Sequence, residues 1–340
     1  MINKKIVFTS PRTVEVQDVD ILPPEKKQVQ VKLDYSTISN GTERANLVGG
    51  QRTSFHSNAT TKYPKTVGYS SAGTVVAVGE GVTSLNVGDR VCLSWSKHAY
   101  IQNIKEEWAR KIPDSVTTKE ASLFHIGTFP LAAIRKCTLE IGESAIVMGQ
   151  GILGLFAVSL LRAAGAAPII AVDPIPKKRA KALTAGADYA LDPFAEGFCS
   201  KVKSITDGGA KVAIEVTGSG KALDQVLDCM APYGRVALLG CTRNSDFTID
   251  YYRKVHGPGI SLIGAHTHAR PKFESSPGMW TEKDDIYTQV KLTELKRLDL
   301  GALIDEVHSP LEAKEVFGRL ADDPTFPLVQ FDWSMIENEQ

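Results

Sequence analysis

Residues 144–173 read SAIVMGQGILGLFAVSLLRAAGAAPIIAVD, and this stretch decides the fold. The apolar run Ala145–Met148 predicts a buried strand, a glycine-rich turn and an apolar helix follow, and Ile169–Val172 predicts a second strand. In such a turn the first glycine permits the sharp bend, the second lets the backbone approach a pyrophosphate, and the third lets the helix pack on the strand. The N–H groups that begin the helix would bind phosphate oxygens. The stretch therefore predicts a βαβ unit that binds a dinucleotide.

Asp173 ends the second strand, 19 residues after Gly154. A carboxylate at this place can accept hydrogen bonds from both hydroxyls of the adenosine ribose and would repel a 2′-phosphate. NAD is therefore predicted in preference to NADP. The following Lys177, Lys178 and Arg179 form either a solvated first helical turn or, if one folds back, a positive contact to the ribose that weakens the preference.

Composition agrees with a protein of two domains. A chain of 340 residues is long for one core. The 39 Lys and Arg residues balance 39 Asp and Glu residues, so no polyanionic partner such as nucleic acid is expected. The N-terminus runs directly into an apolar strand pattern at residues 6–8, and no window approaches the ~20 apolar residues of a membrane span. These features predict a cytoplasmic protein without a membrane partner.

The five cysteines are odd in number, widely separated and without a CxxC pair, so they are expected to be reduced: Cys92, Cys137, Cys199, Cys229 and Cys241.

The pattern of residues changes along the chain and predicts an α/β fold. Residues 1–120 are β-rich with frequent glycine turns, which is typical of a barrel-like domain. Residues 121–268 alternate helix and strand patterns, which predicts a parallel sheet covered by helices. Residues 269–340 contain one strong helical stretch at 310–320 and end on apolar residues 328–331. This last segment is too short for a domain, so it is expected to return to the first one.

Several motifs in this order resemble the medium-chain dehydrogenase/reductase superfamily, which includes the zinc alcohol dehydrogenases. They are the segments 39–43 (SNGTE), 67–75 (VGYSSAGTV), 87–91 (VGDRV) and 215–218 (EVTG), together with the glycine turn and Asp173. The resemblance implies a GroES-like, partly open β-barrel (1–120 and 269–340) and a Rossmann domain (121–268). It also implies an active site between the domains, a nicotinamide hydride carrier and a homodimer or homotetramer. The cofactor contacts expected on this basis are Gly149, Gly151, Ile152, Leu153, Gly154, Asp173, Lys178, Thr217, Gly240 and His266.

The chain departs from the zinc-binding members of the superfamily at the ligand positions. The resemblance places Asn40, Tyr69 and Phe124 where those members carry cysteine, histidine and a third ligand. An amide and a phenol replace thiolate and imidazole poorly for zinc. The segment 92–111 contains a single cysteine, so the four-cysteine structural site is missing too. No metal is therefore predicted.

Without zinc, a side chain must stabilise the alkoxide or take the hydroxyl proton. The resemblance places Thr42 at the substrate hydroxyl, and Tyr69 would either act as donor or base or fill the vacated metal space with its hydroxyl bonded to backbone. Imidazole titrates nearest neutral pH, so His125, His266 and His268 are further candidates, each with a plain structural role as the alternative. An HxH pair on an extended strand would place both rings on one face. Asn40 and Glu43 complete the predicted catalytic set.

Polar residues favour a polyhydroxylated substrate such as a sugar, polyol or cyclitol. They are the stretch 270–285 with Trp280, together with Arg44, Asn46, Gln51, Arg52 and His56. A surface loop or a subunit contact is the alternative for most of them. Three functions stay open: an NAD-dependent, zinc-independent dehydrogenase for a secondary alcohol, a quinone or enoyl reductase acting on a conjugated C=C bond, and a non-catalytic NADH-binding protein.

Overall fold

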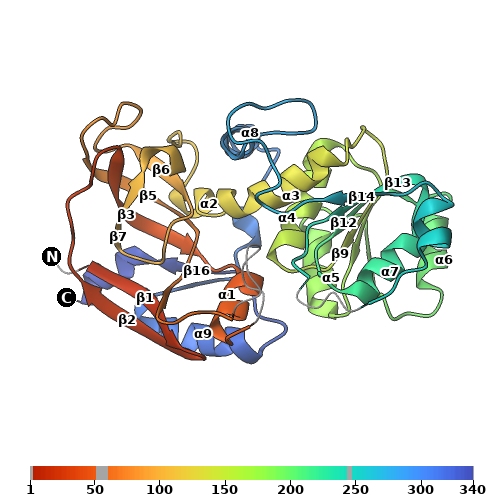
Figure 1. The fold of residues 1–340 in the computed structure, drawn as a ribbon, viewed down its shortest axis with the longest axis horizontal. Coiled ribbons are helices and arrows are strands. Elements are labelled where there is room, and N and C mark those ends of the chain that lie inside the picture. Colours follow the sequence, from red (N-terminus) through yellow and green to blue (C-terminus); the bar gives the residue numbers. More distant parts are fainter. Residues whose placement is uncertain (1–2, 51–59, 243–246, 340) are drawn as a thin grey trace. The chain divides into compact units, whose positions relative to one another are not determined.

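The computed structural model describes residues 3–50, 60–242 and 247–339, without the side chains of 337–339. The chain divides into two compact units (Figure 1). Unit 1 comprises Met1–Ile126 and Asp299–Gln340, and unit 2 comprises Gly127–Leu298. Among the described residues, none of the helices combines the length and the apolar character that a membrane crossing requires.

Unit 1 is built from two sheets, which confirms the predicted β-rich domain. A three-stranded sheet has the order β2 (Thr13–Val19), β1 (Asn3–Ser10), β4 (Lys65–Thr66). The larger sheet has the order β15 (Glu306–His308), β16 (Val329–Asp332), β3 (Gln28–Thr37), β5 (Ser70–Val78), β6 (Arg90–Ser94), β8 (Ala109–Lys111), and β7 (Ile101–Lys105) also pairs with β3. The helices are α1 (Asn40–Leu47), α2 (Thr118–Ala121) and α9 (Ala313–Asp322), with short helical turns at Glu106–Trp108, Gly301–Leu303, Pro310–Glu312 and Trp333–Glu339. Buried aromatic rings fill the space between these elements, among them Phe8, Phe317, Phe331 and Trp333.

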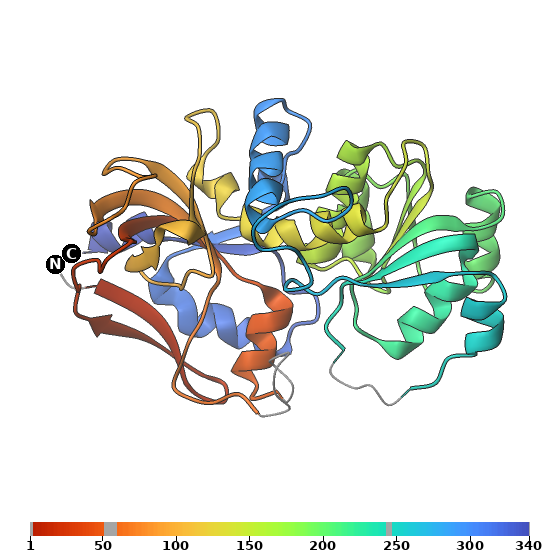
Figure 2. The same ribbon diagram turned by 45° about the horizontal axis from the view of Figure 1, so that its top comes forward.

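Unit 2 contains one parallel sheet with helices on both faces, as the alternating pattern predicts (Figures 1 and 2). Its order is β11 (Tyr189–Leu191), β10 (Ile169–Val172), β9 (Ala145–Met148), β12 (Ala210–Glu215), β13 (Met230–Leu238), β14 (Ser261–Gly264). The helices are α4 (Ile152–Ala164), α5 (Pro176–Thr184), α6 (Phe198–Ile205), α7 (Gly220–Asp228), α8 (Glu282–Glu294) and a π-helical turn at Tyr252–His256, while α3 (Phe124–Lys136) crosses the unit boundary. The strand order reverses beside β9, the place where doubly wound sheets bind nucleotides.

The division differs from the predicted one at two places. Residues 121–126 belong to unit 1 rather than to the Rossmann domain, and residues 269–298 belong to unit 2 rather than to the barrel. Arg270 donates to the Thr128 carbonyl at 2.7 Å, and Asp285 accepts from Arg135 Nε at 2.8 Å. The Arg135 guanidinium also lies 3.5 Å from the centre of the Trp280 ring. These contacts attach the segment to α3, so the expected polar connector is an anchored helix and loop.

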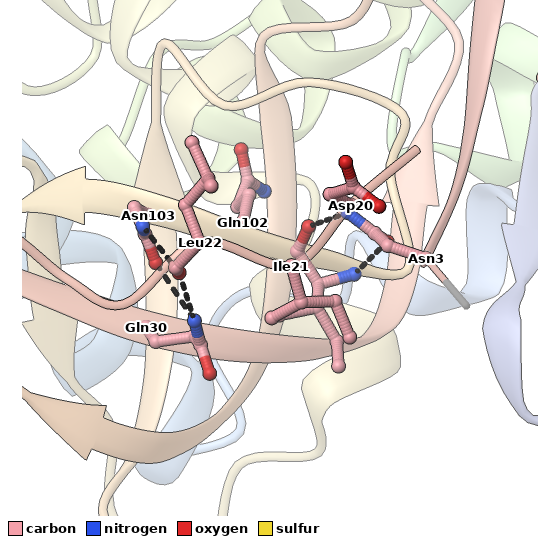
Figure 3. A pocket seen from close by; sticks show the side chains of 8 residues that line it. Asn3, Asp20, Ile21, Leu22, Gln30, Gln102 and Asn103 are labelled. Atoms are coloured by element: carbon pink, nitrogen blue, oxygen red, sulfur yellow. Dashed lines mark hydrogen bonds between the residues drawn. The ribbon is translucent and has the colours of Figure 1, made fainter. Parts of the chain in front are cut away.

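A small hollow of about 150 Å³ lies on unit 1 beside β3 and β7 (Figure 3). Its amide side chains bind neighbouring backbone: Gln30 and Asn103 both donate to the Leu22 carbonyl, at 2.9 and 3.0 Å. Asn3 exchanges two hydrogen bonds with the backbone of Ile101. The amide side chains that line the hollow therefore attach the segment between β2 and β3 to the sheet.

Candidate functional site

The turn between β9 and α4 has the backbone geometry of a phosphate cradle. Gly149 has a φ of +96°, a conformation that L side chains rarely adopt. A Cβ on Gly154 would lie 1.8 Å from the Gly149 carbonyl oxygen, so α4 packs directly on the turn. Gly151 is the N-cap of α4, and a Cβ there would meet nothing within 4 Å. Open space thus adjoins the first helical turn, where Ile152 and Leu153 present backbone N–H groups.

The Asp173 carboxylate follows β10 and is held by backbone amides. The N–H groups of Gln150 and Ile175 each donate to it at 2.8 Å, and its side chain is buried. An ionised carboxylate has about four acceptor positions, so roughly two stay available to a ligand. The Arg179 guanidinium donates to the Asp173 carbonyl and to the Asp192 carboxylate, at 2.7 and 3.1 Å. The Arg179 guanidinium is therefore bound to neighbouring groups of the protein.

Lys178 lies in the first turn of α5, as predicted, and its backbone N–H donates to the Ile175 carbonyl at 3.1 Å.

The loop after β12 packs against the glycine turn. A Cβ on Gly149 would lie 2.9 Å from Thr217 Cγ2, and one on Gly240 would lie 2.2 Å from the Gly218 nitrogen. The Glu215 carboxylate accepts from the Thr217 hydroxyl and from the Thr217 and Gly218 amides, the latter two at 2.7 and 3.1 Å. Burial raises the pKa of Glu215, and these hydrogen bonds lower it less. The predicted contacts Thr217 and Gly240 thus lie at the same edge of the sheet as the cradle.

The two histidines after β14 lie in a turn, so the prediction of an extended HxH strand is wrong at this point. β14 ends at Gly264, and the Ala269 N–H closes a turn on the His266 carbonyl at 2.8 Å. The His268 N–H donates to His266 Nδ1 at 3.3 Å, and the ring centres are 5.3 Å apart. The turn itself, and not strand alternation, brings the rings together.

In unit 1, Tyr69 and His125 meet in a cluster of aromatic rings. Their ring centres are 5.7 Å apart in an edge contact, and Trp95 lies 4.7 Å from His125. The Tyr69 hydroxyl donates to Ser39 Oγ, immediately before α1. The structure therefore brings two predicted residues together. It adds Ser39, which lies in a motif of the resemblance without a predicted role, and Trp95, for which the sequence carried no signal.

Asn40 holds the backbone of its own unit. Its amide donates to the carbonyls of Phe326 and Pro327, at 3.2 and 3.1 Å. Thr42 lies two residues further in the first turn of α1, half-buried, and its carbonyl accepts from Asn46 Nδ2 at 2.9 Å. The N–H groups of the Asn40 side chain are thus engaged, whereas among the described residues no hydrogen bond engages the Thr42 hydroxyl.

Glu43 faces the interior of unit 1 and belongs to a buried network. Its carboxylate accepts from the Ser39 amide at 3.0 Å and lies 2.9 Å from His98 Nε2. His98 Nδ1 is 2.7 Å from Ser36 Oγ, to which the Trp333 indole donates at 2.9 Å. An ionised carboxylate can only accept, so His98 Nε2–H donates to Glu43. In a neutral imidazole Nδ1 then accepts from the Ser36 hydroxyl, whose oxygen also accepts from the Trp333 indole. The network positions the start of α1, which does not support the predicted catalytic role of Glu43.

The positions that would carry zinc ligands do not form a metal site. Asn40 binds two carbonyls, Tyr69 binds Ser39, and Phe124 is fully buried in the core. Across the part of the chain that the structure describes, no group of three or more His, Cys, Asp or Glu side chains is arranged to hold a metal ion. The amide, phenol and phenyl side chains at these three positions do not supply the thiolate and imidazole ligands of a catalytic zinc.

The residues expected to contact a polyhydroxylated substrate bind the protein where they are described. Arg44 donates to the Ala321 carbonyl at 3.0 Å, and Asn46 binds Thr42. Arg270 is buried against Asp285, and Trp280 lies under Arg135. Gln51, Arg52 and His56 lie outside the described residues.

Comparison with known proteins agrees with this architecture. Residues 25–127 match a family model described as alcohol dehydrogenase GroES-like domain, and residues 153–277 match one described as zinc-binding dehydrogenase. The chain is 30% identical to L-threonine 3-dehydrogenase of Pyrococcus horikoshii over 334 residues, 88% of this chain and 90% of the relative. It is 25% identical to D-guloside 3-dehydrogenase of Shigella flexneri, over 94% of this chain and 96% of the relative.

Solved structures share the fold at lower identity. A short chain alcohol dehydrogenase from E. coli CFT073, complexed with NADH, superposes with a TM-score of 0.82 at 18% identity, over 98% of this chain and 99% of that one. Proteins of this fold bind NADH in some structures and NADP in others.

Proposed function

Because the chain belongs to the medium-chain dehydrogenase/reductase superfamily, alcohol dehydrogenase-like, we propose that it is an NAD(H)-dependent, zinc-independent dehydrogenase. Its substrate would be a secondary alcohol, or the corresponding ketone, of a polar small molecule such as a sugar, polyol or cyclitol. The named relatives are dehydrogenases that act on hydroxyl-bearing compounds. The similarity to D-guloside 3-dehydrogenase supports a sugar as the substrate.

The observation that carries the cofactor assignment is the buried Asp173 carboxylate. Two backbone amides fix its orientation, and its remaining acceptor positions suit the two ribose hydroxyls of NAD. A 2′-phosphate would bring a like charge to a partly desolvated carboxylate. The open space at Gly151 leaves room for the pyrophosphate beside the start of α4. When bound, the nicotinamide accepts or gives the hydride.

The chain's own residues must move the proton. When an alcohol is oxidised, its hydroxyl loses a proton as the carbonyl forms, and a positioned base lowers the barrier to that loss. Tyr69 already donates to Ser39, so a proton taken up at Tyr69 Oη could pass along this hydrogen bond. Thr42 can donate and accept at a substrate hydroxyl, and His125 and His266 are the imidazole candidates. Zinc independence is supported by the side chains of Asn40, Tyr69 and Phe124, none of which is a thiolate or an imidazole.

Turnover assays test the proposal. Purified protein would be offered NAD⁺ with a panel of sugars, polyols and cyclitols, and NADH with ketones, enones and quinones, before and after treatment with a zinc chelator. We expect oxidation of at least one polyol or sugar, undiminished by the chelator. Reduction of enones or quinones alone would identify a C=C reductase instead, and NADH binding without any turnover would identify a binding protein.

We further propose a cytoplasmic homodimer or homotetramer. Balanced charge and the habit of the superfamily support this assignment. Size-exclusion chromatography with light scattering would measure the assembly.

A further inference from the structure

Two cysteines that the proposed dehydrogenase chemistry does not use face each other in unit 2. Cys199 is the second residue of α6, and Cys229 is the C-cap of α7, immediately before β13. Their sulfur atoms are 3.3 Å apart, and both thiols are free. Cys199 is half-buried, whereas Cys229 is fully buried. The pair thus combines a half-buried cysteine with a fully buried one whose sulfur lies next to its own.

We propose that Cys199 and Cys229 form a reversible disulfide when the protein meets a hydroperoxide. A disulfide has a sulfur–sulfur length of about 2.05 Å, so the sulfurs at 3.3 Å must approach by roughly 1.3 Å. Rotation about the two Cα–Cβ bonds moves both sulfurs, so the shift is shared between the two side chains. A pair without this proximity would need the backbone to move first.

The chemistry proceeds in two balanced steps. The Cys199 thiolate attacks the peroxide, an S–O bond forms, the O–O bond breaks, and an alcohol leaves after taking a proton. Cys229 then attacks the sulfenic sulfur of Cys199, an S–S bond forms, the S–O bond breaks, and water leaves. Overall, two thiols and one hydroperoxide give one disulfide, one alcohol and one water, so the sulfurs lose two electrons and the peroxide gains them.

The difference in burial indicates which of the two thiols reacts first with the peroxide. Removal from solvent raises the pKa of the Cys229 thiol, and its S–H donates to Cys199. The Cys199 S–H in turn faces the Gln225 carbonyl at 3.8 Å. Cys229 is therefore held as the resolving thiol, shielded from the oxidant until Cys199 has reacted.

The disulfide would lie away from the cofactor cradle. The Cys229 carbonyl accepts from the Ala210 amide at the start of β12, whereas Gly149 and Asp173 follow the ends of β9 and β10. In a parallel sheet, strand starts and strand ends lie at opposite edges. The bond would connect residues 30 positions apart and restrict the unfolded chain, so it should stabilise unit 2 without blocking the cofactor.

Peptide mapping of the full-length protein tests the proposal. Protein treated with hydrogen peroxide would be alkylated under denaturing conditions and digested without reduction. We expect a linked pair of peptides containing Cys199 and Cys229, separated again by dithiothreitol, while the buried Cys137 thiol stays alkylatable. The thermal midpoint should rise on oxidation of the unchanged protein and not of Cys199→Ser.

Failure to link the two peptides at a peroxide dose that oxidises the exposed Cys241 would overturn the proposal. Linkage of Cys199 to any other cysteine would do the same. The Cys199→Ser variant changes a half-buried residue, so it keeps the test available if Cys229→Ser fails to fold. None of these readouts depends on dehydrogenase activity.

Discussion

Alanine at Gly154 and alanine at Gly151 should damage different properties, although the two glycines lie three residues apart in one turn. At Gly154 the new methyl group would lie 1.8 Å from the Gly149 oxygen and 2.9 Å from its carbonyl carbon. Ordinary contact requires more than about 3.3 Å, so turn and helix must separate by roughly 1.5 Å. Overpacking costs typically ~1–3 kcal/mol, and a clash with backbone cannot be relieved by a rotamer change, so about 3 kcal/mol or more is expected.

At Gly151 the methyl group meets no atom within 4 Å, and the φ of −76° suits alanine. The loss of a favourable N-cap residue should cost no more than ~1 kcal/mol. The methyl group would, however, occupy the space beside the first turn of α4 that a pyrophosphate needs. We expect NADH to bind at least roughly tenfold more weakly, equivalent to ~1.4 kcal/mol.

Urea unfolding and NADH titration measure the two properties on the same preparations. Gly154→Ala should lose stability, and Gly151→Ala should keep stability and lose affinity. Tight NADH binding by Gly151→Ala, equal to that of the unchanged protein, would show that the pyrophosphate does not lie over this residue. Unchanged stability of Gly154→Ala would refute the direct packing of α4 on the turn.

Three further perturbations probe the cofactor preference, the proton path and a charged cluster. Asp173→Asn should narrow the ratio of NADPH to NADH dissociation constants, because like charges about 4 Å apart cost roughly 4 kcal/mol at an effective dielectric constant of about 20; an unchanged ratio would sink the ribose assignment. Among His125→Ala, His266→Ala and Tyr69→Phe, at least one should lower kcat by roughly 10² to 10⁴ with little change in NADH affinity, and near-normal turnover in all three would place the base elsewhere. Burial lowers the pKa of His308, but hydrogen bonds to two glutamates outweigh it and raise the pKa overall. Its stabilisation is therefore present below the unfolded pKa of about 6.5 and lost as pH rises through the higher folded value, so His308→Gln should cost up to about 1 kcal/mol at pH 6 and nothing at pH 9 in denaturation curves.

Most of unit 2 could be predicted because its strands are continuous apolar runs between helices. The run Ile169–Val172 is a strand with the predicted bounds. Helix α8, in contrast, was concealed in a stretch that resembles a polar loop, because Asp285, Gln289 and Thr293 lie four residues apart on its buried side. Asp285 is buried only because Arg135 and Arg270 bind it, and hydrophobic periodicity carries no information about such pairing.

The candidate site divides in the same way. The cofactor residues around the glycine turn are contiguous in sequence, so local spacing suffices to identify them. The polar network in unit 1 joins residues far apart, such as Glu43 with His98, which are 55 positions apart. A lone histidine next to a strand gives no sign of its partner. The sequence therefore indicated Glu43 as an acid near the expected site, but it could not indicate that the carboxylate binds His98 and the Ser39 amide in the interior of unit 1.

At two of the expected zinc positions, Asn40 and Tyr69 make hydrogen bonds that help to stabilise unit 1. Asn40 satisfies two carbonyls of the segment before β16, and Tyr69 binds the residue that begins α1. Each bond connects segments distant in sequence, as metal ligation also would. Loss of the Asn40 amide would leave these two backbone carbonyls unsatisfied, at a cost of ~1–3 kcal/mol. Hydrogen bonds thus connect these segments of unit 1, and under the proposed function hydroxyl and imidazole groups would move the proton.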